Sequence, residues 1–342
     1  MAVLAGTAML WAGACGSGDR SSTTRPPATS RPGSQPRAVG SPTTLPWWSH
    51  GRLHVDEGVI RTPLHEIVAR GGTVVVGRTD TRGSTWRILR GDALTPLVTT
   101  AEQGVEPVVS ANGLHVAWVT SRTLRRFDLY TTEGLFTVHA YDVARGREVG
   151  TTTRESRATC CDQSGVIHVG GVDNDGTVLV VRDYERVWAW RPGREPVAAT
   201  GAVRPRAVTG NDQWPGGLSW SSTGDSSGPA AFGAIGGSGL TTRIGRVPQG
   251  QGGLWSPDGS AYVYLPFTKG PGNPPPVVWS SAGRVRLDLR RAGALVGWES
   301  PREVVVRTGR RPTVLVRCDA RTGRCEQAGP PRRDVVLPLT SG

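Results

Sequence analysis

The sequence predicts an all-β fold built from one repeated unit, and three observations support this. Glycine and proline are abundant, at 47 and 26 residues, whereas hydrophobic residues make up only 37% of the 342. This composition suits short strands and tight turns better than long helices. No segment keeps a helical period of apolar residues, and a polar turn that ends in glycine recurs before apolar strands. A single large all-β domain therefore fits this length better than two average domains.

The repeated unit runs from Trp47 onward and contains an inner and an outer hairpin. The inner hairpin begins with a polar turn, and its Asn-Gly or Asp-Gly pair accepts the positive φ angles that such turns require. The clearest inner turns lie at 70–72, 110–113, 173–176 and 256–259. The outer hairpins lie at 86–97, 137–149, 187–197, 277–287 and 314–327. We count six units, which predicts a six-bladed β-propeller of four-stranded antiparallel blades over residues 47–342.

One of the inner turns carries a family signature, formed by Trp255, Ser256, Pro257, Asp258 and Gly259. This motif resembles the blade turn of TolB-like, WD40-like propellers, and 220–224 and 298–301 resemble degenerate copies of it. The resemblance implies that the tryptophan fills the wedge between neighbouring blades while the turn reverses the chain. To close the ring, we expect 52–60 to supply a strand to the last blade, whose own late segment is 334–339.

The N-terminus has the layout of a signal peptide over residues 1–14, with an uncharged apolar run that ends in small residues. The run is too short to span a bilayer as a stable helix. Residues 12–15 resemble the bacterial lipobox, which implies a palmitate-type lipid attachment at Cys15. Ala12 departs from the family preference for leucine, and no basic residue precedes the run, so we expect the true start to lie upstream. An ordinary secretory signal and an accidental apolar start are the alternatives.

Residues 15–46 consist mainly of Ser, Thr, Pro, Gly and Arg. Such a segment has too little apolar surface to offset its ordering entropy, so we expect a lipidated, disordered linker. It would hold the folded domain away from a membrane surface.

The formal net charge is +12, and Lys269 is the single lysine among 40 basic residues. Arginine in place of lysine is typical of a high-GC bacterium. The arginines are scattered through turns, which indicates a solvated basic surface rather than a nucleic-acid stripe. If the charge has a partner, export favours anionic lipid or cell-wall polymer over nucleic acid.

The remaining four cysteines form two pairs. Cys318 and Cys325 flank a predicted hairpin turn, where an exported compartment would oxidise them to a structural disulfide; a metal site is the weaker alternative. The adjacent Cys160 and Cys161 could close a strained vicinal ring, stay reduced, or bind a metal or thiol partner. We favour the vicinal ring, in a structural role.

No motif carries a convincing catalytic or metal site. The segment 224–229 resembles the nucleophile elbow and the nucleophile region of chymotrypsin-like proteases, but no helix is expected after it and no suitable histidine accompanies it. The turn at 173–176 lacks the ligands of a calcium loop. His115, His139 and His168 stand singly in predicted strands. We therefore expect no catalytic residue, no metal and no cofactor.

These observations predict an exported, lipid-anchored, extracytoplasmic protein, a monomer, that binds a protein or cell-envelope ligand without catalysis. The ligand would bind to loops on one propeller face or in the central channel. The alternative is a propeller enzyme, a hydrolase or lyase, with its site in that channel. A third interpretation makes the chain a sensor-like partner of another membrane protein.

Overall fold

The computed structural model describes residues 39–102, 104–128, 131–159, 165–182, 186–201, 207–208, 218–221, 230–235, 240–248, 250–266, 274–289, 294–309 and 311–338. All of them belong to the unit Arg37–Gly342. This part of the chain is all-β, with no helical residues. It accordingly holds no helix with the length and hydropathy to cross a membrane.

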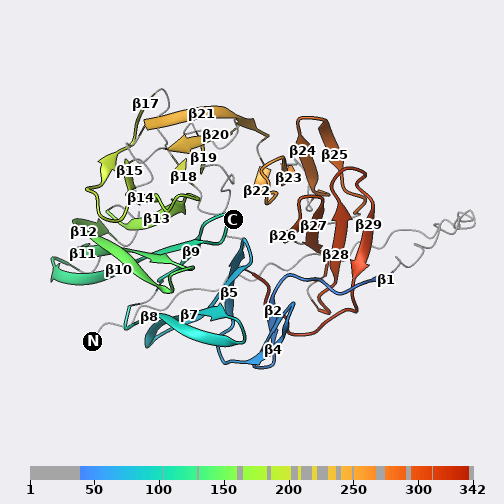
Figure 1. The fold of residues 1–342 in the computed structure, drawn as a ribbon, viewed down its shortest axis with the longest axis horizontal. Coiled ribbons are helices and arrows are strands. Elements are labelled where there is room, and N and C mark those ends of the chain that lie inside the picture. Colours follow the sequence, from blue (N-terminus) through green and yellow to red (C-terminus); the bar gives the residue numbers. More distant parts are fainter. Residues whose placement is uncertain are drawn as a thin grey trace, which may run out of the picture. The chain divides into compact units, whose positions relative to one another are not determined.

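The described strands form seven separate sheets, and most of them are antiparallel meanders of four strands in chain order (Figure 1). The first meander is β5 (Glu66–Arg70), β6 (Thr73–Asp80), β7 (Gly83–Arg90) and β8 (Ala93–Thr100). The second is β9 (Val108–Val109), β10 (His115–Arg126), β11 (Thr131–Asp142) and β12 (Arg147–Thr159). The third is β13 (Ile167–Val172), β14 (Val178–Arg182), β15 (Arg186–Trp190) and β16 (Val197–Ala198).

The next sheets repeat this pattern with additions at the outer edge. One contains β18 (Ala207–Val208), β19 (Leu218–Ser221), β20 (Ala230–Ile235) and β21 (Leu240–Val247), with β17 (Thr200–Gly201) parallel to β21. The next is β22 (Gly250–Trp255), β23 (Ala261–Pro266), β24 (Val277–Ser280) and β25 (Gly283–Arg286). The last is β26 (Ala294–Ser300), β27 (Glu303–Arg307), β28 (Leu315–Asp319) and β29 (Cys325–Ala328). The short strand β1 (Val39–Gly40) joins it, parallel to β29.

Neighbouring sheets bury their faces against each other, which explains the continuous valine runs in their middle strands. In β27, Val304 and Val306 pack in the cluster shared with the β22–β25 sheet, whereas Val305 faces the opposite cluster with Leu45 and Leu337. Equivalent clusters join β5–β8 to β9–β12 and β9–β12 to β13–β16. These neighbouring sheets are thus stacked face to face through shared apolar clusters, as in a propeller.

The seventh sheet explains why six blades do not account for the described strands. It contains β2 (Trp47–Ser49), β3 (Arg52–Val55) and β4 (Gly58–Arg61). Backbone hydrogen bonds of 2.9 Å run both ways between Trp48 and Val336, so the C-terminal segment pairs with β2. The expected closure is therefore corrected. The segment 52–60 stays in its own sheet, and the C-terminal segment crosses to the first sheet instead.

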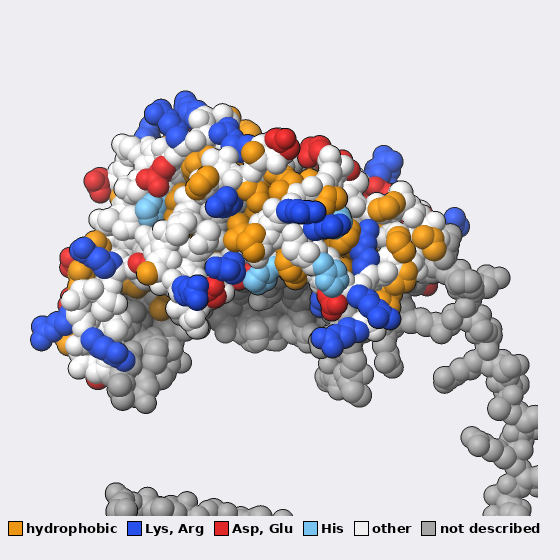
Figure 2. Space-filling model, turned by 90° about the horizontal axis from the view of Figure 1, so that it is seen from below, with side chains coloured by type: hydrophobic (Ala, Val, Ile, Leu, Met, Phe, Trp, Pro, Cys, Tyr) orange, Lys and Arg blue, Asp and Glu red, His pale blue; other side chains and the backbone are white. Residues whose placement is uncertain are grey.

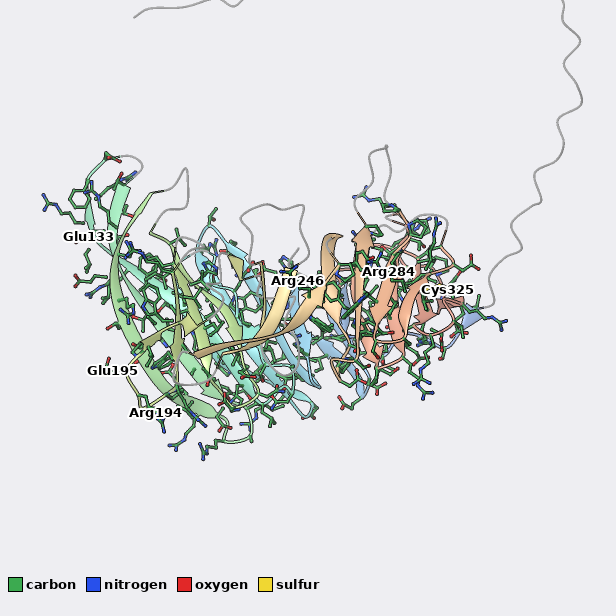
Figure 3. The ribbon with its side chains drawn as sticks, turned by 90° about the horizontal axis from the view of Figure 1, so that it is seen from above. Glu133, Arg194, Glu195, Arg246, Arg284 and Cys325 are labelled. Atoms are coloured by element: carbon green, nitrogen blue, oxygen red, sulfur yellow. A yellow bond between two sulfur atoms is a disulfide. The ribbon has the colours of Figure 1, made fainter. Side chains whose placement is uncertain are left out.

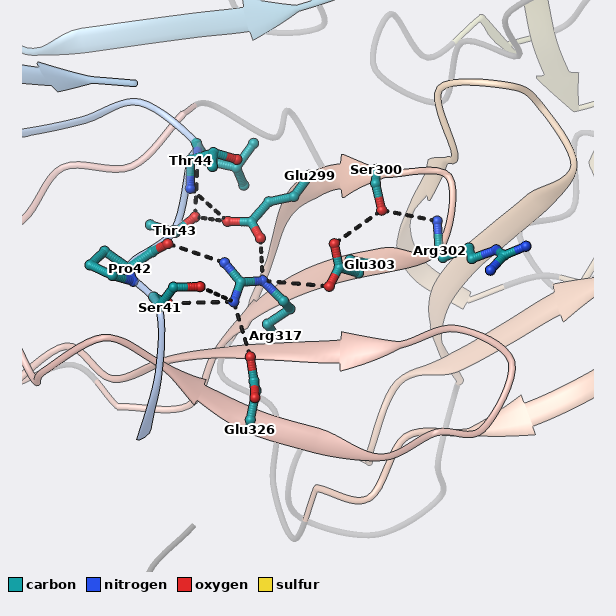
Figure 4. A network of polar contacts seen from close by, with 11 residues as sticks. Ser41, Pro42, Thr43, Thr44, Glu299, Ser300, Arg302, Glu303, Arg317 and Glu326 are labelled. Atoms are coloured by element: carbon teal, nitrogen blue, oxygen red, sulfur yellow. Dashed lines mark hydrogen bonds and ion pairs between the residues drawn. The ribbon is translucent and has the colours of Figure 1, made fainter. Parts of the chain in front are cut away.

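The opposite end of the chain is fixed to the last sheet. Strand β1 pairs with β29, and residues 41–44 lie over the side chain of Arg317 on β28 (Figure 4). The folded unit thus begins before Trp47, within the range expected to be linker. The Arg317 guanidinium donates to the Pro42 carbonyl at 3.1 Å and to Ser41, and it also bonds the carboxylate of Glu299. Thr43 and Thr44 donate to that same carboxylate.

This network buries a charge pair. Arg317 is 8% exposed and the Glu299 side chain 4%. The Glu299 hydrogen bond, which outweighs the desolvation of Arg317, raises the pKa of Arg317 further, and Glu326 at 3.0 Å adds to it. A buried pair of this kind stabilises little against an apolar replacement, but losing one partner leaves an uncompensated charge.

We predict that Arg317→Leu lowers the free energy of unfolding by about 3–5 kcal/mol, because Glu299 would stay buried without its partner. The double variant Arg317→Leu/Glu299→Leu should recover a large part of that loss. Urea unfolding followed by circular dichroism measures both, and Arg321→Leu, at an exposed turn of the same sheet, serves as the control. The interpretation fails if Arg317→Leu is no more destabilising than the control.

Candidate functional site

The inner turns form one edge of the sheets, and two of them contain the same pattern of hydrogen bonds. In the Trp255–Gly259 motif, Ser256 Oγ donates to Asp258 Oδ1 at 2.7 Å and accepts from the Ala261 N–H at 2.9 Å. Ser110 Oγ does the same with Asn112 Oδ1 at 2.7 Å and the His115 N–H at 3.0 Å. Both serines are fully buried. The serine and the Asx residue therefore fix the turn from inside.

Successive inner turns contact one another. Thr73 Oγ1 donates to the Gly113 carbonyl at 2.7 Å. The Asn112 N–H donates to Asn174 Oδ1 at 2.9 Å, and its side-chain amide donates to the Asn174 carbonyl at 3.0 Å. These bonds join three neighbouring sheets into a continuous surface, which we call the inner-turn face.

Two glycines allow the closest approach on this face. Gly71 and Gly113 have φ angles of 54° and 72°, which favour glycine. A Cβ on Gly113 would overlap the Gly71 carbonyl oxygen, and a Cβ on Gly71 would overlap the backbone of Asn112. The turns thus meet backbone to backbone, and this leaves little freedom to move.

A cavity of about 270 Å³ opens on this face between the β9–β12 and β13–β16 sheets. Its ionisable lining residues are His115, Asp142, Arg145, Asp175 and Arg191. Arg145 pairs with Asp142 at 3.4 Å and Arg191 with Asp175 at 3.7 Å. The arginine side chains are 67% and 45% exposed. These pairs are weak enough for a ligand to compete with them.

The local turns explain the ionisation of the acids. Burial opposes the charge of Asp175, but hydrogen bonds from Thr177, with the charges of Arg191 and His115, outweigh it and lower its pKa. Burial dominates at the neighbouring Asp173 and raises its pKa. Asp175 therefore stays ionised in the cavity.

The cavity can bind a ligand that carries both charges. Its carboxylates accept from an ammonium or guanidinium group, and its guanidiniums bind carboxylates. The volume lies below the roughly 300–1,000 Å³ of typical small-molecule pockets. One or two side chains of a protein partner would fill it.

Sequence reasoning treated Arg145 and Arg191 as scattered surface charge. Both occupy the turn between the third and fourth strands of their sheets, in the related segments 144–148 (ARGRE) and 191–195 (RPGRE). Aligning the repeats turn by turn could have found this recurrence. Figure 2 shows that basic side chains on the face drawn there are spread among apolar and acidic ones. That view agrees with the scattered charge expected from the sequence.

The other candidate residues lie at different places in the chain, and some lie outside the described residues. Trp255 is buried in a cluster with Val247 of the preceding sheet. Cys318 and Cys325 oppose each other on β28 and β29 and are joined by a disulfide. The signal peptide, Cys15, the vicinal pair Cys160 and Cys161, and the motif at 224–229 lie outside the described residues.

The three histidines that the sequence places singly in strands have different surroundings. His115 lines the cavity, and burial lowers the pKa of His168 on the inner strand β13. His139 bonds Thr120 and Glu148, both at 2.9 Å. Within the part of the chain that the structure describes, no three His, Cys, Asp or Glu side chains are grouped to hold a metal ion.

Comparison with known proteins gives similarity in fold only. No family model matches the sequence, and no curated protein does. Oligogalacturonate lyase in complex with manganese is 14% identical with a TM-score of 0.46, over 85% of this chain and 86% of that chain. The dihydro-heme d1 dehydrogenase NirN is 14% identical with a TM-score of 0.45, over 88% and 76%.

TolB from Acinetobacter baumannii is 10% identical with a TM-score of 0.39, over 83% of this chain and 61% of that chain. At this level of similarity, the description of the fold rests on the sheets of this chain and not on these comparisons. We take no ligand or activity from these proteins.

We predict that Gly113→Ala destabilises the fold by about 1–3 kcal/mol more than Gly91→Ala, because only the first adds a clash to the backbone strain. Gly91 has a similar φ of 60° with nothing within 4 Å of the added Cβ. Urea unfolding of the two variants measures the difference. Equal losses would show that the turns do not meet as described.

Proposed function

We propose that this protein is an exported, membrane-tethered binding propeller whose inner-turn face recognises a segment of a partner protein. The observation that carries the proposal is the mixed-charge cavity that lies between two adjacent sheets. Its small volume and paired charges suit the side chains of a protein partner, and the locked turns beside it preorganise the surface.

The tether rests on the sequence. The lipobox-like residues 12–15 precede a segment rich in Ser, Thr and Pro. Acyl chains on Cys15 would anchor such a linker at about 0.8 kcal/mol per buried CH₂. The linker would leave the folded unit free to reach a partner in the envelope.

We predict that reversing both cavity arginines, in Arg145→Glu/Arg191→Glu, abolishes capture of the partner from detergent-solubilised membranes of the source bacterium. Two like charges would then face Asp142 and Asp175 and repel the acidic groups of the ligand. Quantitative mass spectrometry of the retained proteins compares this variant with the natural chain. The matched control is Arg321→Glu/Arg324→Glu, at the corresponding turn of the last sheet, which should retain the partner. An identical set of retained proteins for all three chains would contradict the proposal.

We predict a second result for the anchor. Intact-mass analysis of the protein purified from membranes should show an N-terminus at Cys15 carrying acyl chains, and Cys15→Ser should shift the protein to the soluble fraction. An unmodified cysteine in membrane-purified protein would remove the tether while leaving the binding face unaffected.

A further inference from the structure

One hairpin is much longer than the rest. Strands β10, β11 and β12 have 12, 12 and 13 residues, whereas no other described strand exceeds eight. The extra length of β10 is exposed, since every residue from Arg122 to Asp128 is open to solvent. On β11 and β12, by contrast, Gly134 and Ser156 of the same extension are buried, so it is the β10 side that faces solvent.

The extension carries exposed apolar side chains among arginines. Leu124 and Phe127 are 44% and 41% exposed, three positions apart. The guanidiniums of Arg125 and Arg157 lie 4.9 and 4.3 Å from the centre of the Phe127 ring. Two like charges are thus gathered on one exposed aromatic ring, an arrangement that an anion would stabilise.

The other face of the same ribbon repeats this chemistry. The Arg154 guanidinium lies 4.8 Å from the Trp188 ring, in a cavity of about 380 Å³ that Arg182 also lines. The acidic groups nearby are Asp128 at the turn, Glu133 opposite both Arg125 and Arg157 in register, and Glu155 in the cavity. The described part of the ribbon's extension carries five arginines against these three acids, namely Arg122, Arg125, Arg126, Arg154 and Arg157.

The base of the hairpin is braced. The His139 ring stacks on buried Trp118 at a centroid distance of 5.0 Å, and its two nitrogens bond Thr120 and Glu148. These residues span β10, β11 and β12 below the extension. The contact holds the three strands together where they leave the sheet.

The tip lies at the edge of the sheet opposite the inner-turn face. The β9–β10 and β11–β12 turns share one edge because the strands alternate in direction, so the β10–β11 turn lies at the other edge. Figure 3 shows this separation, with Glu133 at one edge and Arg194 and Glu195, on the equivalent outer turn of the next sheet, at the other. A partner on the inner-turn face would leave the tip accessible.

We propose that the exposed end of this ribbon, formed by Arg122–Asp128 and Arg157, docks on a bilayer surface rich in anionic lipid. Phe127 and Leu124 would enter the interfacial region, where aromatic rings reside, and Arg125, Arg157 and Arg122 would contact phosphate groups. Arginine stems can lie along the apolar surface while their heads stay at the headgroup level. This docking is independent of the acyl anchor and of the binding function proposed above.

The test uses the full chain with Cys15→Ser, so that no acyl chain contributes, and phosphatidylcholine vesicles with or without about 30% phosphatidylglycerol. Co-sedimentation should show partitioning to the anionic vesicles that falls with added salt. Arg125→Gln/Arg157→Gln should lower the partition coefficient about 25-fold, at about five-fold per arginine. Leu124→Ser/Phe127→Ser should lower it about ten-fold through lost apolar burial.

The matched control, Arg321→Gln/Arg324→Gln, removes the same charge from the β28–β29 turn. Because that turn lies away from the ribbon, the control should stay within about two-fold of the parent. All variants should melt at the parent temperature, which separates lost docking from lost folding. Equal partitioning of the arginine variant and its control would overturn the proposal. So would an unchanged Leu124→Ser/Phe127→Ser variant, which would indicate general attraction to polyanions. The hairpin variants should still capture the partner, so this proposal and the proposed function can fail separately.

Discussion

The fold depends on how the two ends of the chain are held. A ring of sheets has edges only where it begins and ends, and an unpaired edge there would expose backbone groups and apolar faces. In this chain, β1 is added to the last sheet while the C-terminal segment is added to the first. The buried Arg317 fixes the N-terminal side of this exchange by bonding backbone and side-chain oxygens of residues 41–42 and the carboxylate of Glu299. One guanidinium thus connects segments that lie more than 250 residues apart in the sequence.

The antiparallel meander also divides the surface into two kinds of edge. Short inner turns, held by a buried serine and an Asx side chain, meet through glycines and polar bonds, so that edge is preorganised. The β10–β11 hairpin at the other edge is long, basic and exposed. A protein partner on the first edge and a membrane on the second are compatible, because neither surface uses the residues of the other.

Much of the sheet pattern could be predicted from the sequence, because middle strands such as β14, β23 and β27 are buried on both faces and polar turns separate the strands. The inner turns at 70–72, 110–113, 173–176 and 256–259 all lie between the first and second strands of a sheet. The closure could not be predicted in the same way. Strand β1 has two residues and no pattern of its own, and its parallel pairing depends on a distant arginine. The cavity could not be predicted either, because Arg145 and Arg191 come from two neighbouring sheets and line it only once those sheets are placed side by side.

The crossing of the C-terminal segment also has a consequence for biogenesis. A chain synthesised from its amino end delivers β2, β3 and β4 long before Val336, the residue that pairs with Trp48 of β2, has been made. Until then the first sheet keeps an open margin beside Trp48, which is available to chaperones or to wrong partners. Pairing of this edge is thus tied to the arrival of the segment around Val336, and a chain that stopped before it would keep the margin beside Trp48 open.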